Sequence, residues 1–524
     1  MHDLVIVGGT VYDGFGGPGV VADVAIAGGA VVGIGADLGP AREQIDASGL
    51  AVAPGFVDPH THSDTVPLMP DAQPFKLFQG VTTEIIGNCG YSCAPTTESN
   101  REAMAAEMGH ATPSFAEYLA EIEAAGPTNH VAALVGHNTL RSAVAGFGRV
   151  LSEAQVTEMC ALADAAFAAG AVGWSSGLEY VPGAYADSTE LVALGRVARR
   201  WGASYATHLR SESEGLLDSV DEAIRVARAS GIRLQVSHCK ASGPAAHGLA
   251  HELLERITAA RLGGVDVLGD LYPYAACSTG LVAVLPTEAS EGGEQRLLER
   301  LADPEARERL RLIAERPNEG TGAGLWREVR PGEVTVTQHA DPAVSGRTLA
   351  DLAGERDPWE VLCELVRADP VSAAVLHTMQ ERDIETFMRH PLISIGSDSD
   401  TPEGLVHPRT YGTFPRFLGH YVRERGVLPL GEAIRRVTSA AAAQFGLSER
   451  GWLGVGSAAD VCVFDPVTIG HAGDYERPEA DTTGVRWVLL DGAVVIGDGV
   501  FTGERRGRVL RSAASGRGPT RGTQ

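Results

Sequence analysis

The middle of this 524-residue chain alternates short strand-like runs with Ala-, Leu-, Glu- and Arg-rich segments of helical character. Segments 153–169 and 214–230 are two such predicted helices. Alternating strands and helices with about eight repeats predict an α/β fold of the (β/α)8 barrel type. The eight predicted strands end in polar residues, near His60, Asn88, His137, Ser176, His208, His238, Asp270 and Asp398.

Both ends of the chain read as short strands with Gly or Asp-Gly turns and no helical period. Such a pattern predicts small antiparallel sheets rather than further β–α units. We therefore expect one β-sandwich domain built from both termini, with the barrel inserted between its two parts. The predicted limits are 1–53 and 451–504 for the sandwich and 54–450 for the barrel.

Two further segments interrupt this plan. The gap before the last barrel strand is long and contains strand-like pieces at 333–339 and 373–377. An insertion that shapes the site is predicted within this gap, at about residues 280–372. Residues 505–524 contain six Arg and no acidic residue among many small ones, and such a composition predicts a disordered basic tail.

Charge and hydropathy exclude several classes of protein. The chain has 43 Lys or Arg and 67 Asp or Glu, a net charge of −24, so nucleic acid is an unfavourable partner. No apolar run approaches the ~18 residues of a membrane span, and no signal peptide precedes the first strand. Seven cysteines at irregular spacing do not suggest a disulfide framework, so we expect a cytoplasmic protein with reduced thiols.

Two histidines follow the first predicted barrel strand. The segment FVDPHTHSD at 56–64 places His60 and His62 two residues apart. Residues two apart in an extended segment point to the same side, so both imidazoles can bind one metal ion. An H-x-H pair by itself is more typical of two surface histidines in a loop.

Four more candidate ligands end other strands, namely Cys89, His208, His238 and Asp398. A thiolate is a strong zinc ligand, and a carboxylate beside a metal can serve as general base and acid. Taken singly, a cysteine such as Cys89 is more often a buried small hydrophobe, and Asp398 is also typical of a turn or helix cap. Because all six candidates fall at the carboxyl ends of predicted strands, the active-site face of such barrels, they predict a metal site.

Several motifs carry a resemblance to a known family: PGFVDPHTHSD, GVTTEIIGNCG, VGHNTLR, GWSSGLEYVPGAYA, ATHLRSE, QVSHCKASG, DLYPYAACST, IGSDSD and HPRTYGTFPR. With them, the chain resembles the amidohydrolase superfamily and, within it, the N-acyl-D-amino-acid deacylases (D-aminoacylases), up to about residue 503. The resemblance implies a tight zinc held by Cys89, His208 and His238. It also implies a second, weaker site at His60, His62 and Asp398.

The lysine content agrees with that implied ligand set. Many members of the superfamily bridge two metals with a carboxylated lysine, usually on strand four. This chain has only Lys76 and Lys240, and neither lies near the fourth predicted strand. The resemblance therefore implies that Cys89 takes the bridging position.

The implied reaction is zinc-dependent hydrolysis of N-acyl-D-amino acids to a carboxylate and a free D-amino acid. Zinc polarises the amide carbonyl and lowers the pKa of its bound water to roughly 7. Asp398 takes the proton as hydroxide attacks and then hands it to the leaving amine. Preference for D over L substrates is implied by the resemblance alone.

The α-carboxylate of such a small-molecule substrate needs a cationic partner. Lys240 lies two residues beyond His238, so an extended strand end aims it at the same cavity, although a solvated surface charge is the more common role of a lysine. The resemblance gives Lys240 the carboxylate and adds four anchoring positions, Tyr180, Tyr272, Ser278 and Arg409. Residues 279–286 contain no Arg or Lys, which favours neutral or hydrophobic acyl-amino acids.

Two positions are less clear. Ser399 follows Asp398 where the family commonly has Gly, which predicts an altered loop. His137 is interpreted as a structural residue rather than a substrate contact. The remaining alternatives are amidohydrolases acting on a cyclic amide, a lactone or an N-acyl dipeptide. A non-enzymatic scaffold is disfavoured because all six candidate ligands are present.

Overall fold

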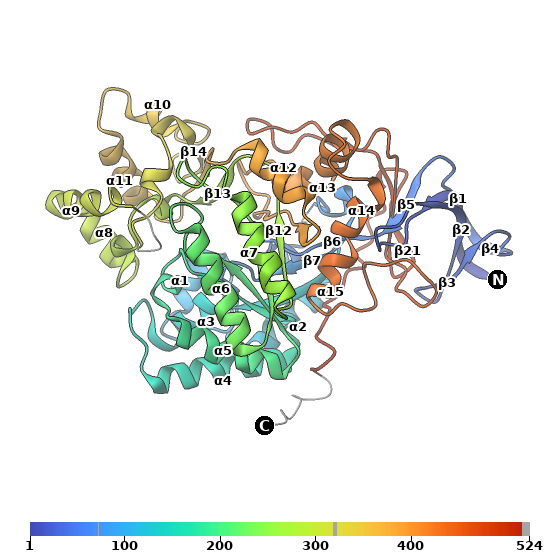
Figure 1. The fold of residues 1–524 in the computed structure, drawn as a ribbon, viewed down its shortest axis with the longest axis horizontal. Coiled ribbons are helices and arrows are strands. Elements are labelled where there is room, and N and C mark those ends of the chain that lie inside the picture. The colour runs from blue at the N-terminus through green and yellow to red at the C-terminus, as the bar shows by residue number, and fades with distance from the viewer. Residues whose placement is uncertain (72, 318–321, 516–524) are drawn as a thin grey trace.

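The computed structural model describes residues 1–71, 73–317 and 322–515 (Figure 1). Eight strands form one parallel sheet in the order β16-β12-β11-β10-β9-β8-β7-β6. All eight coincide with the predicted barrel strands. They are β6 (Phe56–Asp58), β7 (Val81–Ile86), β8 (His130–Gly136), β9 (Gly173–Gly177), β10 (Ser204–His208), β11 (Arg233–Val236), β12 (Val267–Leu271) and β16 (Ile393–Ile395).

The first and last strands of this sheet meet just beyond their carboxyl ends. The backbone N–H of Asp398 donates to the carbonyl of His60 at 2.8 Å, and that of His62 donates to the carbonyl of Ser399 at 2.7 Å. These two bonds join β6 to β16 and nearly close the sheet into the predicted (β/α)8 barrel. They also place the H-x-H segment directly beside Asp398.

Helices follow most of the strands and cover the barrel from outside (Figure 1). The predicted helix 153–169 has the expected limits, because Ser152 and Gln155 form a capping box at its start. The predicted helix 214–230 begins two residues later, at Leu216. The helices around the barrel are α1 (Arg101–Met108), α2 (Phe115–Ala125), α3 (His137–Ala145), α4 (Glu153–Ala169), α5 (Ser188–Arg200), α6 (Leu216–Ser230), α7 (Ala250–Leu262), α12 (Glu381–Arg389), α13 (Arg409–Arg416), α14 (Leu430–Arg436) and α15 (Ser439–Gln444).

Both faces of the barrel strands are buried, because helices cover the outside and side chains fill the inside. Every residue of β7, β8, β9 and β10 is buried. The rings of Trp174 and Tyr205, on neighbouring strands, stack with centroids 3.9 Å apart. Burial on both faces explains why the strands read as apolar runs that become polar only at their carboxyl ends.

The terminal strands form one nine-stranded sheet, which lies beside the barrel (Figure 1). β5 pairs with β1 from its own end of the chain and with β17 from the other end, so the predicted domain is built from both termini. Phe464 of this sheet packs edge-on against Phe56 of the barrel. Its strands are β1 (His2–Val11), β2 (Val20–Ala27), β3 (Ala30–Gly35), β4 (Ala41–Asp46), β5 (Ala51–Pro54), β17 (Val461–Phe464), β20 (Val485–Leu490), β21 (Ala493–Gly497) and β22 (Val500–Phe501). A separate two-stranded sheet joins β18 (Gly470–His471) and β19 (Thr482–Thr483).

The insertion before the last barrel strand has its own small core. Three antiparallel strands, in the order β13-β15-β14, pack with short helices around Trp359, which is fully buried. The two strand-like pieces foreseen in this segment correspond to β14 and β15. The elements are β13 (Cys277–Gly280), β14 (Val334–Gln338), β15 (Ala373–Leu376), α8 (Glu294–Ala302), α9 (Pro304–Ala314), α10 (Leu349–Ala353) and α11 (Pro358–Ala368).

The expected disordered tail is ordered in its described part, residues 505–515. Val131 of β8 donates its N–H to the carbonyl of Arg508 and accepts a bond from the N–H of Leu510. Val509 between them is buried, and the Arg505 guanidinium donates to the carbonyl of Gly126. The prediction from composition was wrong for these residues, because two adjacent apolar residues and backbone pairing outweigh an Arg-rich composition. Residues 516–524 lie outside the described part.

None of the described helices is long and apolar enough to cross a membrane.

Candidate metal centre and active site

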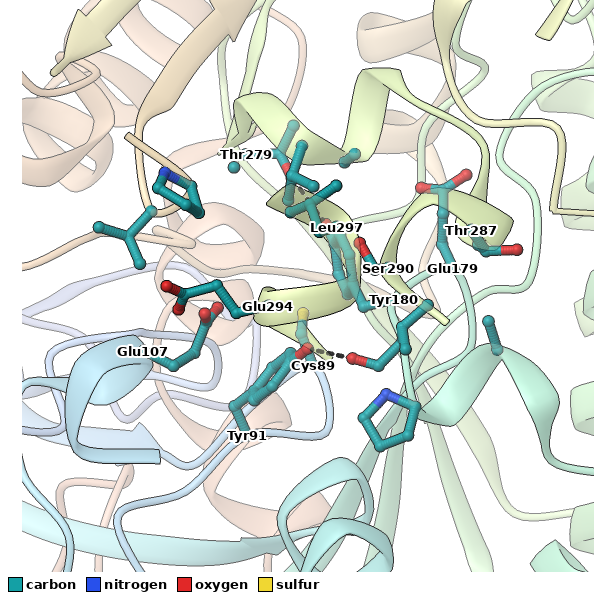
Figure 2. Close-up of a pocket in the computed structure, with 18 of the residues that line it drawn as sticks. Cys89, Tyr91, Glu107, Glu179, Tyr180, Thr279, Thr287, Ser290, Glu294 and Leu297 are labelled. Carbon is teal, nitrogen blue, oxygen red and sulfur yellow. Dashed lines mark hydrogen bonds between the residues drawn. The ribbon is translucent and has the colours of Figure 1, made fainter. Parts of the chain in front are cut away.

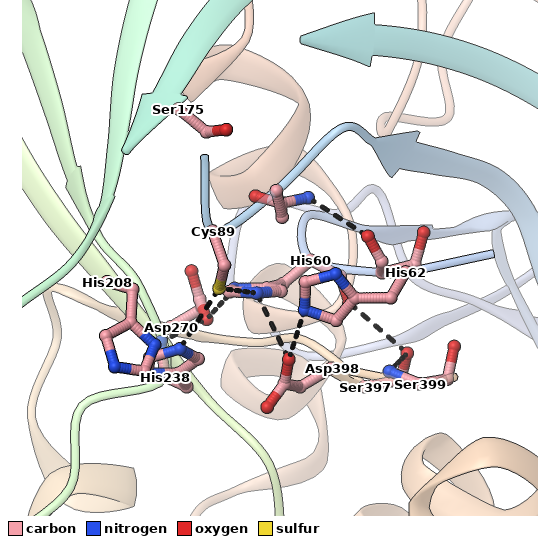
Figure 3. Close-up of polar contacts among 12 residues, drawn as sticks. His60, His62, Cys89, Ser175, His208, His238, Asp270, Ser397, Asp398 and Ser399 are labelled. Carbon is pink, nitrogen blue, oxygen red and sulfur yellow. Dashed lines mark hydrogen bonds and ion pairs between the residues drawn. The ribbon is translucent and has the colours of Figure 1, made fainter. Parts of the chain in front are cut away.

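All six predicted metal ligands meet at the carboxyl end of the barrel (Figure 3). They form two overlapping groups, and within each group the ligand atoms lie within 4.8 Å of one another. Cys89 belongs to both groups. The first group is Cys89, His208 and His238, and the second is His60, His62, Cys89 and Asp398.

The thiol of Cys89 lies between the two groups. Its Sγ is 3.3 Å from Nε2 of His60 and 3.4 Å from Nε2 of His238. Burial raises the pKa of this thiol, but the charges of His60, His238 and His62 more than offset that effect and hold the pKa well below its usual value. The position favours a thiolate, the form of cysteine that binds metals.

Three of the six ligands sit in a strained backbone conformation directly after their strands. Cys89, His238 and Asp398 have φ angles of +49°, +31° and +52°. Non-glycine residues seldom adopt positive φ, and such strain persists where the surrounding structure imposes it. Within the GNCG motif, a Cβ on Gly87 would lie 2.1 Å from a carbonyl oxygen of β8, which explains why glycine stands there.

Buried carboxylates hold the outer nitrogens of three imidazoles. Nδ1 of His60 lies 3.2 Å from Asp270, and Nε2 of His208 lies 3.0 Å from Glu179. Nδ1 of His238 lies 2.9 Å from Glu212. In metal sites such carboxylates fix the tautomer and the orientation of the ligating histidine, so the inner nitrogens are left for a cation.

These three carboxylates were not identified from the sequence. The available signals were local: Glu179 lies in the LEY segment, Glu212 follows His208 by four residues, and Asp270 ends the seventh strand. An Asp or Glu at such positions is too common to be assigned without knowing which imidazole it faces.

The donor set fits a metal ion. Among the described residues, Nδ1 of His208 is buried and has no hydrogen-bond partner, although its Nε2 is held by Glu179. A buried nitrogen without a partner is costly unless something else binds it. One thiolate and two imidazoles suit zinc, and two imidazoles with a carboxylate suit a second divalent ion.

Asp398 is held from two sides. Its Oδ1 lies 3.0 Å from Nε2 of His62 and 3.2 Å from Nε2 of His60, while its Oδ2 accepts a 2.6 Å bond from Arg409. Burial raises the pKa of this carboxyl, but Arg409 and then His60 and His238 more than offset it, and the pKa lies well below the usual range. Asp398 is thus ionised, and its Oδ1 faces the imidazoles of His60 and His62.

The predicted substrate anchors lie around the same site. Lys240 is buried and bonded to Glu212, so its charge is already compensated. The Arg409 guanidinium stacks on the Tyr272 ring at 4.8 Å and lies 3.4 Å from the Ser278 carbonyl. The hydroxyl of Tyr180 is 3.1 Å from that of Thr279.

Lys76, the second lysine, forms a buried hydrogen-bond network next to the site. Nζ of Lys76 donates to Asp58 at 2.6 Å, to Ser397 at 2.9 Å and to Ser399 at 2.7 Å. This buried network ties the end of β6 to the loop that carries Asp398. Ser399, where the family commonly has glycine, therefore has a defined partner.

His137 has a structural contact. Its Nε2 lies 2.7 Å from Glu190, which also binds Arg141 at 3.1 Å. Arg141 in turn donates to the carbonyls of Gly148 and Arg149 at 2.6 and 2.8 Å. Through Glu190 and Arg141, these contacts link His137 to the loop at 148–149, where Arg149 lines the cavity.

A cavity of about 760 Å³ opens from Cys89 and His62 towards the insertion (Figure 2). Such a volume is within the range of small-molecule sites. The carboxylates of Glu107, from α1, and Glu294, from α8, lie close together on its wall (Figure 2). A further wall is apolar and includes Met104, Phe147, Leu285 and Leu297.

The fold and the site together define a class of protein. A barrel that carries histidines, a cysteine and an aspartate at the carboxyl ends of its strands is typical of metal-dependent hydrolases. The amidohydrolase family model matches residues 43–276 and 348–496. The chain belongs to this family and, within it, to the N-acyl-D-amino-acid deacylases, and it is a hydrolase.

Similarity to characterised relatives extends over the whole chain. A D-aminoacylase of Alcaligenes xylosoxydans xylosoxydans is 35% identical and matches 98% of both chains. An N-acyl-D-glutamate deacylase of the same organism is 36% identical over 98% of this chain and 97% of its own. The N-acyl-D-glutamate deacylase of Bordetella bronchiseptica, solved with zinc and a phosphonate inhibitor, is 34% identical with a TM-score of 0.82, covering 97% of this chain and 99% of that one.

Proposed function

We propose that this protein hydrolyses the amide bond of N-acyl-D-amino acids with the aid of zinc, yielding a carboxylate and a free D-amino acid. The observation that carries the proposal is that two groups of candidate metal ligands share Cys89 at the base of the cavity. Asp398 belongs to one of these groups. The deacylase relatives of nearly the same length supply the substrate class.

The ligands divide between two positions. Cys89, His208 and His238 would hold the tight zinc, while His60, His62 and Asp398 would complete a second, weaker site. When bound, zinc polarises the amide carbonyl and makes water a better nucleophile. The three carboxylates behind the histidines keep the ligating nitrogens turned inward.

Asp398 transfers the proton in this proposal. Its Oδ2 is held by Arg409, so its Oδ1, which faces His60 and His62, is the oxygen that would accept the proton of the attacking water. The same oxygen then returns that proton to the nitrogen of the leaving amine. Arg409 keeps the carboxyl ionised between turnovers, which a general base requires.

The substrate carboxylate is assigned to the cationic groups beside the ligands. Lys240 and Arg409 are both buried there, and Tyr180, Tyr272 and Ser278 lie around them. Glu212 already compensates the charge of Lys240, and Asp398 that of Arg409. The substrate carboxylate therefore binds to these cations by charge-assisted hydrogen bonds and not to an uncompensated positive charge.

The cavity favours neutral over acidic amino-acid side chains. Arg149 and Arg210, the two arginines on its wall, are paired with Glu291 and Glu222. Glu107 and Glu294 have no cationic partner within 4 Å among the described residues. An acidic side chain entering the cavity would therefore meet like charge.

A steady-state panel of N-acetyl-D- and N-acetyl-L-amino acids with added zinc tests the proposal. We expect turnover of neutral D-substrates such as N-acetyl-D-methionine, weaker turnover of N-acetyl-D-glutamate and little of the L-forms. Dihydrouracil and a hydantoin in the same panel represent the cyclic amides. Turnover of these two in the absence of any D-substrate would replace the proposed function with cyclic amide hydrolysis.

A further inference from the structure

One buried carboxylate contacts both a candidate metal ligand and the predicted carboxylate anchor. Oε1 of Glu212 lies 2.9 Å from Nδ1 of His238, and its Oε2 lies 2.5 Å from Nζ of Lys240. The Glu212 side chain is 7% exposed, so water competes little for these contacts. Glu212 follows β10, whereas His238 and Lys240 follow β11, so the carboxylate ties two neighbouring loops of the site together.

The nitrogen of His238 that faces Glu212 has a second neighbour. Nζ of Lys240 lies 3.0 Å from the same Nδ1. An ammonium can only donate a hydrogen bond and a carboxylate can only accept one, so Nδ1 cannot bond to both at once. The contact with Glu212, at 2.9 Å, is the one whose partner also holds Lys240.

Glu212 therefore reaches both residues with one carboxylate. If His238 binds a cation through Nε2, the atom facing Cys89 at 3.4 Å, then Glu212 at Nδ1 would fix the orientation of its ring. The other oxygen of Glu212 fixes the position of the Lys240 ammonium beside the cavity.

We propose that Glu212 is a positioning residue that orients His238 for the metal and, through the same carboxylate, holds Lys240 ready for the substrate carboxylate. Only the part that concerns Lys240 rests on the proposed function. The effect on metal binding concerns the protein without substrate and is measured separately.

The test is a set of four variants: Glu212→Ala, Lys240→Met, the double variant and Asp218→Asn. Zinc affinity is measured by competition with a chromogenic chelator, and folding is checked by thermal unfolding. Asp218 is an exposed carboxylate in the first turn of α6 and serves as the matched control. Because Glu212→Ala alone leaves the Lys240 ammonium buried without a partner, the double variant keeps the test valid if the single one unfolds.

We expect zinc to bind about 10- to 100-fold more weakly to Glu212→Ala and to the double variant, but normally to Lys240→Met and Asp218→Asn. Glu212→Gln, which keeps an acceptor for Nδ1, should recover part of the loss. If the double variant binds zinc as tightly as Lys240→Met, the effect belongs to the unpaired lysine and the proposal is overturned.

The substrate arm uses saturating zinc. Lys240→Met and the double variant should raise KM for an N-acyl-D-amino acid by the same factor and affect the corresponding neutral N-acyl amine less. Equal effects on both substrates would refute the role of Lys240. If the unchanged enzyme hydrolyses no N-acyl amino acid, the proposed function fails, whereas the zinc affinities still decide the role of Glu212.

Discussion

At the residue scale, the site is built from pairs in which one side chain is useful only because another holds it. Asp398 has one oxygen fixed by Arg409 and the other turned to the histidines. Three imidazoles are held from behind by buried carboxylates. These partners come from different strand ends, so single substitutions should have separable effects on metal binding and on turnover.

Replacing Asp398 by Asn tests the proton transfer. We expect kcat to fall by about 10²- to 10⁴-fold, because an amide cannot accept the proton of the attacking water. Zinc binding should persist, since the proposed ligands Cys89, His208 and His238 are untouched. Kinetics and metal content measured on the same sample check both statements, and near-normal turnover would contradict the assignment of Asp398.

Replacing Lys76 by Met tests the buried network under the site. Asp58 would lose its cationic partner in a fully buried position, so we expect a loss of about 3–5 kcal/mol in unfolding free energy. The control is Arg42→Met, which removes the surface pair with Asp3, at 69% and 48% side-chain exposure. The control should cost about 0–1 kcal/mol. Denaturant unfolding of both variants measures the difference, and equal losses would show that the Lys76 network adds no stability.

At the element scale, the cavity depends on α1 from the barrel and α8 from the insertion. Each contributes one carboxylate to the cavity wall, Glu107 and Glu294. The two residues are far apart in the sequence, and neither helix alone suggests a charge selection. Only the packing of the insertion over the barrel brings them together.

Replacing Glu107 by Gln tests this charge selection. Removing one of the two carboxylates should raise kcat/KM for N-acetyl-D-glutamate by about 2- to 5-fold, the scale of an exposed charge pair. The value for N-acetyl-D-methionine should stay nearly constant. Glu102→Gln, on the exposed face of the same helix, is the matched control. Equal changes for both substrates would show that the cavity does not select by charge.

At the scale of the whole molecule, three parts meet around the barrel. The terminal sheet packs on one side, the insertion covers the cavity, and the segment 505–515 runs along the start of β8. The last contact had no counterpart in the sequence prediction. It joins residues 505–515 to strand β8 of the barrel.

Shortening the chain tests the contribution of that segment. A chain ending at residue 504 loses the backbone bonds at Val131 and the burial of Val509, so it should unfold at a temperature several degrees lower than one ending at Ser515. Comparing these two chains isolates residues 505–515. Equal unfolding temperatures, recorded by calorimetry or circular dichroism, would show that the segment is dispensable.

The sequence by itself determined the barrel and the candidate ligands, because both depend on local patterns. Apolar strands that turn polar at their carboxyl ends gave all eight barrel strands, and the position of a residue after such a strand placed Cys89 and Asp398 on one face. Only the tertiary structure decided which groups hold those ligands. Asp270 reaches a histidine 210 residues away, Glu179 and Glu212 reach histidines on the next strand of the barrel, and the pairing of Lys240 with Glu212 depends on two loops meeting. The ordered conformation of residues 505–515 also depends on the tertiary structure. The free energy that stabilises it comes from burial and pairing against β8 and not from the composition of the segment.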